Sequence, residues 1–125
     1  MSAKYYRDLI AWNKAFELAV VIYRETAKFP TEEKYGLRSQ LRRAGVSVPS
    51  NIAEGEGRNP GEFLRYLSIA LGSLNELETQ VLISDALGYL GEGQVTVLMG
   101  MTAEVDRLIN GLSRSLRNSK RPTTH

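Results

Sequence analysis

The chain has 125 residues and a formal net charge of +2, with no cysteine and a single histidine as its last residue. This length suffices for one domain with a buried core, while the composition excludes disulfides, thiolate metal sites and cysteine nucleophiles and argues against histidine-based catalysis. No apolar run approaches the roughly 20 residues of a membrane-spanning helix, and the first residues lack the apolar stretch of a signal peptide, so we expect a soluble cytoplasmic protein without a membrane partner.

Residues 9–28 form the first predicted helix. One face repeats at alternating steps of three and four, which is typical of a helix in a bundle. It contains Trp12, Ala15, Phe16, Ala19, Ile22, Tyr23 and Thr26. Asp8 stands where an N-cap would, and Phe29-Pro30 ends the helix because the residue before proline avoids the α region. We expect Trp12 and Tyr23 to be core anchors rather than stacking platforms for bases.

The second predicted helix runs from Thr31 to about Glu54, with Thr31 as N-cap and two acids in the first turn. Its apolar face contains Leu37, Leu41, Ala44, Val48 and Ile52. Pro49 removes one backbone hydrogen bond, so we predict a kink near residues 45–49 rather than an end. Gly55 and Gly57 then offer C-terminal turn positions.

The third predicted helix begins at a strong local signal, in which Asn59 caps, Pro60 takes the first helical position and Glu62 reaches back as in a capping box. It ends near Gly88 to Gly91. Its apolar face contains Phe63, Leu64, Leu67, Ala70, Leu71, Leu74, Leu77, Val81 and Leu82. The small residues Gly72 and Ser73 predict a close crossing with a neighbouring helix.

The fourth predicted helix spans roughly residues 92–118. Its apolar face keeps a strict spacing of three and four and contains Val95, Leu98, Thr102, Val105, Ile109, Leu112 and Leu116. Four long helices with short connections predict an all-α fold, an antiparallel up-down four-helix bundle, as a single domain over residues 1–118. Residues 119–125 are predicted to be a disordered polar tail.

No catalytic constellation is visible in the sequence. Glu76 and Glu78 are two residues apart, so they point to different faces of one helix. A di-iron motif needs a histidine that the helices lack, and no glycine-rich loop follows a strand. We therefore expect no enzyme activity, no cofactor and no metal. A weaker option is an enzyme that uses Glu54 or Glu76 as a base, which requires a concave pocket.

The polar side chains of the second helix have two interpretations. In the structural one they form a buried network with Glu76 or Gln80 of the third helix, which fixes the register between helices. That network comprises Gln40, Arg43, Ser47, Asn51 and Glu54. In the functional one, Arg38, Arg42 and Arg43 contact phosphates on an exposed face. Arg43 is turned by about 100° from Arg42, so both interpretations can hold in part.

Several sequence pieces are similar to one known family. They are RDLIAW at 7–12, IYRET at 22–26, YGLRSQLRRAGVSVPSNIAEG at 35–55 and FLRYLSIALGSLNELETQ at 63–80. Over about residues 7–90 the chain resembles the 23S rRNA intervening-sequence proteins, also labelled S23. The positions that match the family motif are Gln40, Arg43, Ser47, Asn51, Glu54 and Arg58.

The resemblance implies a small four-helix bundle that assembles as a homopentamer. A related protein, the accessory variability determinant of diversity-generating retroelements, binds nucleic acid and a reverse transcriptase through a positively charged surface. By this relation the expected partners are further copies of the chain, RNA or DNA, and a protein such as a reverse transcriptase. The candidate phosphate contacts are then Arg38, Arg42, Arg43 and Arg58. The alternative is a structural or protein-binding module in which these arginines form ion-pair networks.

Overall fold

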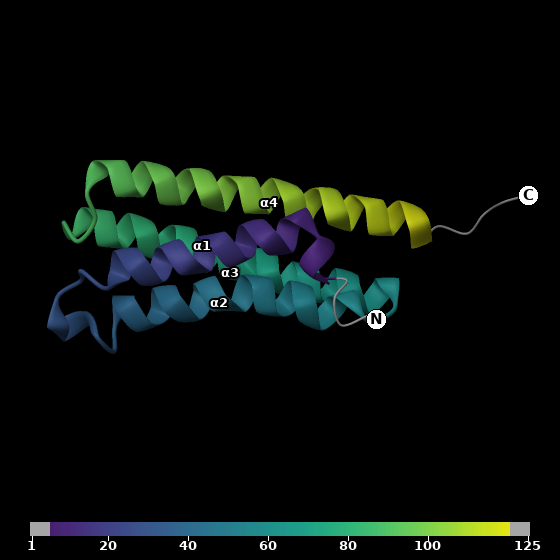
Figure 1. Cartoon of the computed structure of the whole chain (residues 1–125), viewed down its shortest axis with the longest axis horizontal. Coiled ribbons are helices and arrows are strands. Elements are labelled where there is room, and N and C mark those ends of the chain that lie inside the picture. Colours follow the sequence, from purple (N-terminus) through teal and green to yellow (C-terminus); the bar gives the residue numbers. More distant parts are fainter. Residues whose placement is uncertain (1–5, 121–125) are drawn as a thin grey trace, which may run out of the picture.

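The structure is a computed structural model that describes the backbone of residues 6–120 and the side chains of residues 6–118. Four α-helices run up and down in turn: α1 (Ile10–Thr26), α2 (Leu37–Glu56), α3 (Pro60–Ala86) and α4 (Glu92–Lys120) (Figure 1). A short 3-10 helix, η2 (Thr31–Glu33), lies between α1 and α2. The described residues contain no strand. The predicted all-α antiparallel four-helix bundle is confirmed.

The helices lie at the four corners of a square, each packed against its two neighbours. Contacts join α1 with α2, α2 with α3, α3 with α4, and α1 with α4, and within the described residues none joins a diagonal pair. The apolar faces of all four helices meet in one core, whose largest fully buried side chains include Leu18, Ile22, Leu41, Leu67 and Ile109. Because α2 and α4 lie on opposite corners, α2 keeps a broad face for other contacts.

The first helix differs from its prediction at its start and on one face. Residues 6–8 form a 3-10 turn, so α1 begins at Ile10, its N-cap is Leu9, and Asp8 is not the cap. Phe16 and Tyr23 are 50% and 45% exposed, so the expectation that Tyr23 is a core anchor is wrong. The predicted positions Ala15, Ala19, Ile22 and Thr26 are buried as expected, and Ala11 and Leu18 complete the buried stripe. Trp12 is half-buried at its edge.

The second predicted helix divides into two. Thr31 begins η2 instead of α2, and α2 begins at Leu37. Glu33 Oε1 accepts a hydrogen bond of 2.9 Å from the Leu37 backbone N–H, one of the donors that a helix start leaves free. The helix then continues through Pro49 to Glu56. The prediction that Pro49 does not end the helix is therefore confirmed.

Gly55 lies inside α2 and is buried, so the prediction that it forms a turn is wrong. A Cβ atom at this position would lie 2.7 Å from Tyr66 Cβ and 2.9 Å from Phe63 Cδ1 of α3. Such distances are too short for carbon atoms. The glycine is thus required for the close approach of α2 to α3.

The predicted Asn59 cap and Pro60 at the first helical position are confirmed, because the Asn59 side chain accepts a hydrogen bond of 2.9 Å from the Glu62 backbone N–H. The Glu62 side chain does not reach back as in a capping box and lies instead 3.5 Å from Arg58 Nη1. The third helix ends in a Schellman motif: Gly88, with φ of 79°, donates to the Asp85 carbonyl, and Tyr89 donates to the Ser84 carbonyl, both at 2.9 Å. These two bonds satisfy carbonyls that the end of a helix leaves free.

Two expectations for the apolar face of α3 are wrong. Leu82 is exposed, and a Cβ atom at Gly72 would meet nothing within 4 Å, so Gly72 makes no close crossing. Ser73, its neighbour, is buried instead.

The predicted face of α4 is confirmed, since Leu98, Thr102, Val105 and Ile109 are buried. The helix continues to Lys120, two residues beyond the predicted end, and residues 121–125 of the predicted tail lie outside the described residues. Over the described residues, each helix is too short or too polar to cross a membrane.

Candidate nucleic-acid interface

Two arginines of α2 donate hydrogen bonds to the last turn of α1 and to the segment that follows it. Arg42 donates from Nε to the Thr26 hydroxyl at 2.9 Å and from Nη2 to the Tyr23 carbonyl at 3.1 Å. Arg38 Nη2 donates to the Phe29 carbonyl at 3.0 Å, just beyond the helix. Cations are favourable here because the free carbonyls of a helix C-terminus carry partial negative charge. Arg42 therefore caps α1 and Arg38 fixes the segment that follows it, roles that the sequence pattern does not indicate.

Tyr23 is part of the same arrangement. The Arg42 guanidinium carbon lies 4.4 Å from the centre of the Tyr23 ring, within the range of a cation–π contact. This contact keeps the exposed ring and the guanidinium in fixed relative positions. The Tyr23 ring therefore packs against the Arg42 guanidinium and not in the core.

The positive charge of these residues is not cancelled by carboxylates. Within residues 6–118, no ion pair joins Arg38, Arg42 or Arg43 to an acid. Arg43 is exposed and donates no hydrogen bond within the protein over that range. The ion-pair network of the alternative interpretation is thus not formed by these three arginines inside the described chain.

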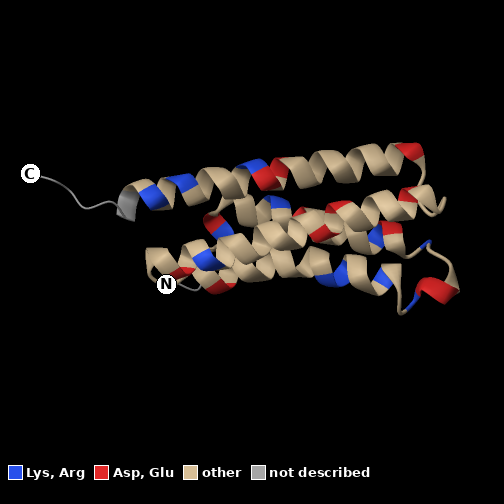
Figure 2. Cartoon of the chain, turned by 180° about the vertical axis from the view of Figure 1, so that it is seen from behind, with Lys and Arg blue, Asp and Glu red and all other residues tan. Residues whose placement is uncertain are grey.

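A surface groove of about 690 Å³, here called the basic groove, lies beside the start of α2. Its cationic residues are Lys34, Arg38, Arg42 and Arg43, and no Asp or Glu lines it. Tyr35, which also lines it, is 86% exposed. Figure 2 shows the basic stretches of α2 gathered at the end of the bundle where α1 connects to α2. Lys34 was missed in the sequence, although its spacing of four from Arg38 could have indicated it.

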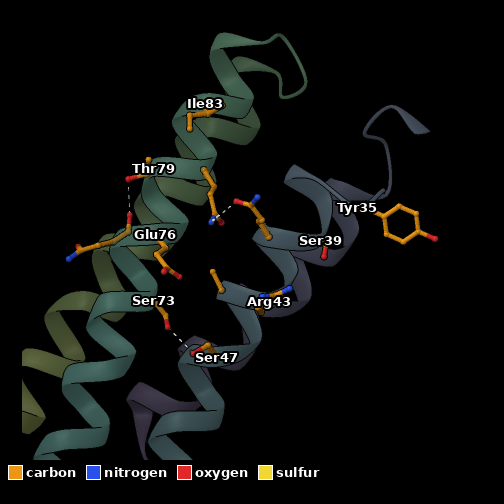
Figure 3. A pocket seen from close by; sticks show the side chains of 12 residues that line it. Tyr35, Ser39, Arg43, Ser47, Ser73, Glu76, Thr79 and Ile83 are labelled. Carbon is orange, nitrogen blue, oxygen red and sulfur yellow. Dashed lines mark hydrogen bonds between the residues drawn. The ribbon is translucent and has the colours of Figure 1, made fainter. Parts of the chain in front are cut away.

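A second groove, here called the polar groove, lies between α2 and α3 and has a volume of about 790 Å³ (Figure 3). Hydrogen-bonding side chains dominate its walls, among them Ser39, Gln40, Ser73, Glu76, Thr79 and Gln80. Arg43 and Tyr35 line both grooves. The two grooves therefore form one continuous surface with α2 between them.

Part of the predicted polar network exists at the floor of this groove. The hydroxyls of Ser47 and Ser73 lie 2.8 Å apart and join α2 to α3 (Figure 3). Asn51 Nδ2 donates to the Ser47 carbonyl at 2.8 Å and to its hydroxyl at 3.0 Å. Gln80 Nε2 makes a long hydrogen bond of 3.5 Å to Gln40 Oε1. The sequence did not identify Ser73 as a hydrogen-bonding partner, because a serine beside a glycine suggested only close packing.

Glu54 and Glu76 do not join this network. Glu54 is exposed, and Oε2 accepts a hydrogen bond of 2.6 Å from Arg58 Nη2. Glu62 Oε1 lies 3.5 Å from Arg58 Nη1. The pKa of Arg58 is raised above its ordinary value, mainly by the hydrogen bond that its guanidinium donates to Glu54. Glu76 lines the polar groove, and no ion pair within residues 6–118 includes it.

Arg58 is thus separated from the other three candidate arginines. It lies 15 positions beyond Arg43, just past the end of α2 at Glu56, and the helix between Arg43 and Glu56 alone spans roughly 20 Å. Two carboxylates also partly neutralise it. Among the described residues, no group of three or more His, Asp or Glu side chains is placed to hold a metal ion.

A third groove, here called the apolar groove, follows the exposed side of α1 and α2 and has a volume of about 650 Å³. Phe16, Tyr23 and Val46 line it and are 42% to 50% exposed. The rings of Trp12 and Phe16 lie 5.2 Å apart between centroids, which is typical of an aromatic pair. Phe16 and Tyr23, which were expected to face the core, therefore belong to a second apolar stripe that a single chain leaves uncovered.

Comparisons with known proteins give one family and one fold. The sequence profile described as 23S rRNA-intervening sequence protein matches residues 7–111. A crystal structure of a protein with unknown function, from the S23 ribosomal protein family of Bacteroides thetaiotaomicron, is similar with a TM-score of 0.78 and 24% sequence identity. The match covers 91% of this chain and 99% of that chain. A comparison with curated proteins finds no significant match.

Proposed function

This chain belongs to the 23S rRNA-intervening sequence protein family, and from this premise we propose that it is a non-catalytic, cytoplasmic homo-oligomer that binds RNA or DNA through the basic groove. The observation that carries the proposal is the groove itself: four cationic side chains line it and no carboxylate does. Phosphate contacts of this kind supply most of the sequence-independent affinity for nucleic acid.

The cations of the groove differ in their roles. Arg42 uses two donors on the last turn of α1 and Arg38 uses one on the Phe29 carbonyl just beyond it, and these bonds hold their guanidinium groups in place. A guanidinium carries five N–H donors, so both keep donors for a phosphate. Their charge is weakened by the partial negative charge of the helix end, about half an elementary charge, but not cancelled. Arg43 has no such neighbour and is the strongest single candidate for a phosphate contact.

Self-association is the second part of the proposal. The apolar groove exposes aromatic and aliphatic side chains of two helices, and a contiguous apolar patch on a monomer commonly marks an interaction site. We assign a second copy of the chain to it, in a pentamer as the family resemblance implies. Such an assembly repeats the basic groove, so one nucleic acid can contact several grooves at once.

Light scattering after size-exclusion chromatography tests the assembly. Phe16→Glu places a charge in the apolar groove and should lower the measured mass to that of a smaller species. Val97→Glu serves as the matched control, because Val97 is as exposed but lies on α4, outside that groove. A wild-type mass of 13.9 kDa, that of one chain, would remove the proposed assembly.

Filter binding of RNA over a series of salt concentrations tests the nucleic-acid function. On a single strand, the logarithm of affinity falls linearly with the logarithm of salt concentration, and each phosphate neutralised by a cation contributes about 0.7 to the steepness of that slope. Arg43→Ala should weaken binding and reduce that slope by roughly 0.7. Arg58→Ala should leave the slope unchanged, because two glutamates already partly neutralise Arg58. Absence of RNA binding by the wild type at low salt contradicts the function.

The alternative, a structural or protein-binding module, is favoured by the bonds that Arg42 makes to the last turn of α1 and Arg38 makes to the segment after it. Its partner would be a protein, such as the reverse transcriptase that the resemblance implies. Arg43→Glu separates the two functions. Loss of RNA binding with an unchanged oligomer mass supports nucleic-acid binding, whereas a changed mass in a protein that never bound RNA supports the alternative.

A further inference from the structure

The polar groove carries an inference that rests on the proposed function and deepens it. We propose that it receives one unstacked base of a single-stranded nucleic acid, with an exocyclic amino group on that base, while the neighbouring phosphates lie in the basic groove. The bound class is then an RNA or DNA single strand containing cytosine, adenine or guanine in preference to uracil.

The first observation is the continuity of two grooves with different chemistry. Arg43, Ser39 and Tyr35 line both. On one side the walls are cationic without any acid, and on the other they carry amides, hydroxyls and one carboxylate. A nucleotide has the same division, since its phosphate is anionic and its base edge presents neutral donors and acceptors. The volume of the polar groove, about 790 Å³, lies in the range of small-molecule sites.

The second observation is Glu76, a carboxylate on the α3 wall that forms no ion pair within the described residues (Figure 3). An ionised carboxylate accepts hydrogen bonds and donates none, so it repels a phosphate and favours a group that presents N–H donors. The exocyclic amino groups of cytosine, adenine and guanine fit this requirement. Uracil has a carbonyl at the corresponding position, so it fits less well.

The third observation is the state of two glutamine amides. Gln80 Oε1 is buried without a hydrogen-bond partner, and Gln80 Nε2 makes only a long bond of 3.5 Å to Gln40. A buried acceptor without a partner is unfavourable. A base whose amino group enters the groove offers the missing donor once the Gln80 amide turns toward it. Glutamine amides also match the mixed donor and acceptor edge of a base.

The polar groove favours single strands over duplexes, because a base must be accessible to enter it. The Watson–Crick edges of a duplex are already paired, so the proposed contact with them requires a base that is unpaired and turned out of the stack. Tyr35 stands at the junction of the two grooves and points away from α3 into solvent (Figure 3). An exposed ring at this place offers a stacking surface to the next base, as in other single-strand sites.

Fluorescence anisotropy with short labelled single-stranded RNAs tests the inference. Oligo-C and oligo-U of equal length carry the same number of phosphates, so the ratio of their dissociation constants reports the base alone. We expect about tenfold tighter binding of oligo-C, and weaker binding of a duplex of the same length. Glu76→Gln should bring the ratio close to one. The glutamine amide can accept from the amino group of cytosine or donate to the carbonyl of uracil, so it no longer distinguishes the two bases. The lost negative charge also strengthens the phosphate contacts, but by the same factor for both RNAs, so this effect cancels in the ratio.

Glu78→Gln is the matched control, since Glu78 lies two residues further along α3 and lines a different groove, against α4. It should leave the ratio unchanged. Equal affinity of the wild type for oligo-C and oligo-U overturns the inference and leaves the proposed function intact, whereas no binding of either RNA overturns both. A change of oligomer mass in Glu76→Gln assigns the polar groove to a contact between copies and also overturns the inference.

Discussion

Replacing Gly55 with alanine should destabilise the bundle, although it removes a glycine from the interior of a helix. The new Cβ atom would lie 2.7 Å from Tyr66 Cβ and 2.9 Å from Phe63 Cδ1. Tyr66 Cβ is attached directly to the backbone of α3, so no change of rotamer moves it away. Relief requires that α2 and α3 separate slightly along their shared interface.

Two opposing terms set the size of the effect. Alanine is favoured over glycine in a helix interior by about 1 kcal/mol. Extra atoms in a well-packed core cost roughly 1–3 kcal/mol. The difference predicts a net loss of about 1 kcal/mol in the free energy of unfolding, and at most about 2 kcal/mol.

Urea unfolding followed by circular dichroism measures this change, at one fixed protein concentration because the proposed self-association would make apparent stability concentration-dependent. Gly72→Ala is the matched control, since Gly72 lies in the middle of α3 and a Cβ atom there meets nothing within 4 Å. It should stabilise the protein by up to about 1 kcal/mol. If both variants are stabilised equally, the close approach of α2 and α3 at Gly55 does not exist.

Three further predictions concern the connections at one end of the bundle. Arg42→Met keeps the apolar stem but removes the cap of α1, so urea unfolding should show a loss of about 1–2 kcal/mol, whereas Arg43→Met should leave stability unchanged. Gly88→Ala places a Cβ atom at a φ of 79° and should cost about 1 kcal/mol or more in the same measurement; no loss would contradict the left-handed turn. The hydrogen bond to Glu33 raises the pKa of Tyr89 above its ordinary value. The stabilisation that this bond gives the fold is therefore complete below the pKa of an unfolded tyrosine, and it is lost as pH rises through the higher pKa of the folded state. An NMR titration of labelled tyrosine rings should show that pKa fall in Glu33→Gln, and an unchanged value would contradict the assignment.

The helices and most of the core are predictable because burial repeats with the helical period. Leu41, Val48 and Ile52 are buried on α2, and Val105 and Ile109 are buried on α4, each in a single stripe. The start of α3 is also local, since the Asn59 cap needs only the next three residues. These features depend on the chain's own periodicity and not on which helix lies beside them.

The face of α1 was harder to predict because that helix carries two apolar stripes. The stripe through Leu18 and Ile22 enters the core, while the one through Phe16 and Tyr23 faces outward. Periodicity alone gives both stripes the same spacing. The exposed stripe can be recognised only when the neighbouring helices have been placed.

The sequence indicated which residues belong to the candidate site but not how they are arranged in space. The sequence placed Arg38 and Arg42 on one face of a helix, yet their bonds to the carbonyls of Phe29 and Tyr23 depend on how α1 ends beside α2. Arg58 follows the same pattern of basic residues but lies near the far end of the helix with its own glutamates. Ser73 enters the network only through the contact between α2 and α3.

The square arrangement of the helices has a consequence for how the chain folds. Three of the four interfaces join helices that follow one another in sequence, and only the contact of α1 with α4 brings the two ends of the chain together. Contacts between consecutive helices have a short sequence separation and form at a small loop-closure cost, so they favour rapid folding of the chain. The entropic barrier is then concentrated in the closing contact of α1 with α4, and substitutions in that interface should slow folding more than equally destabilising substitutions between α2 and α3.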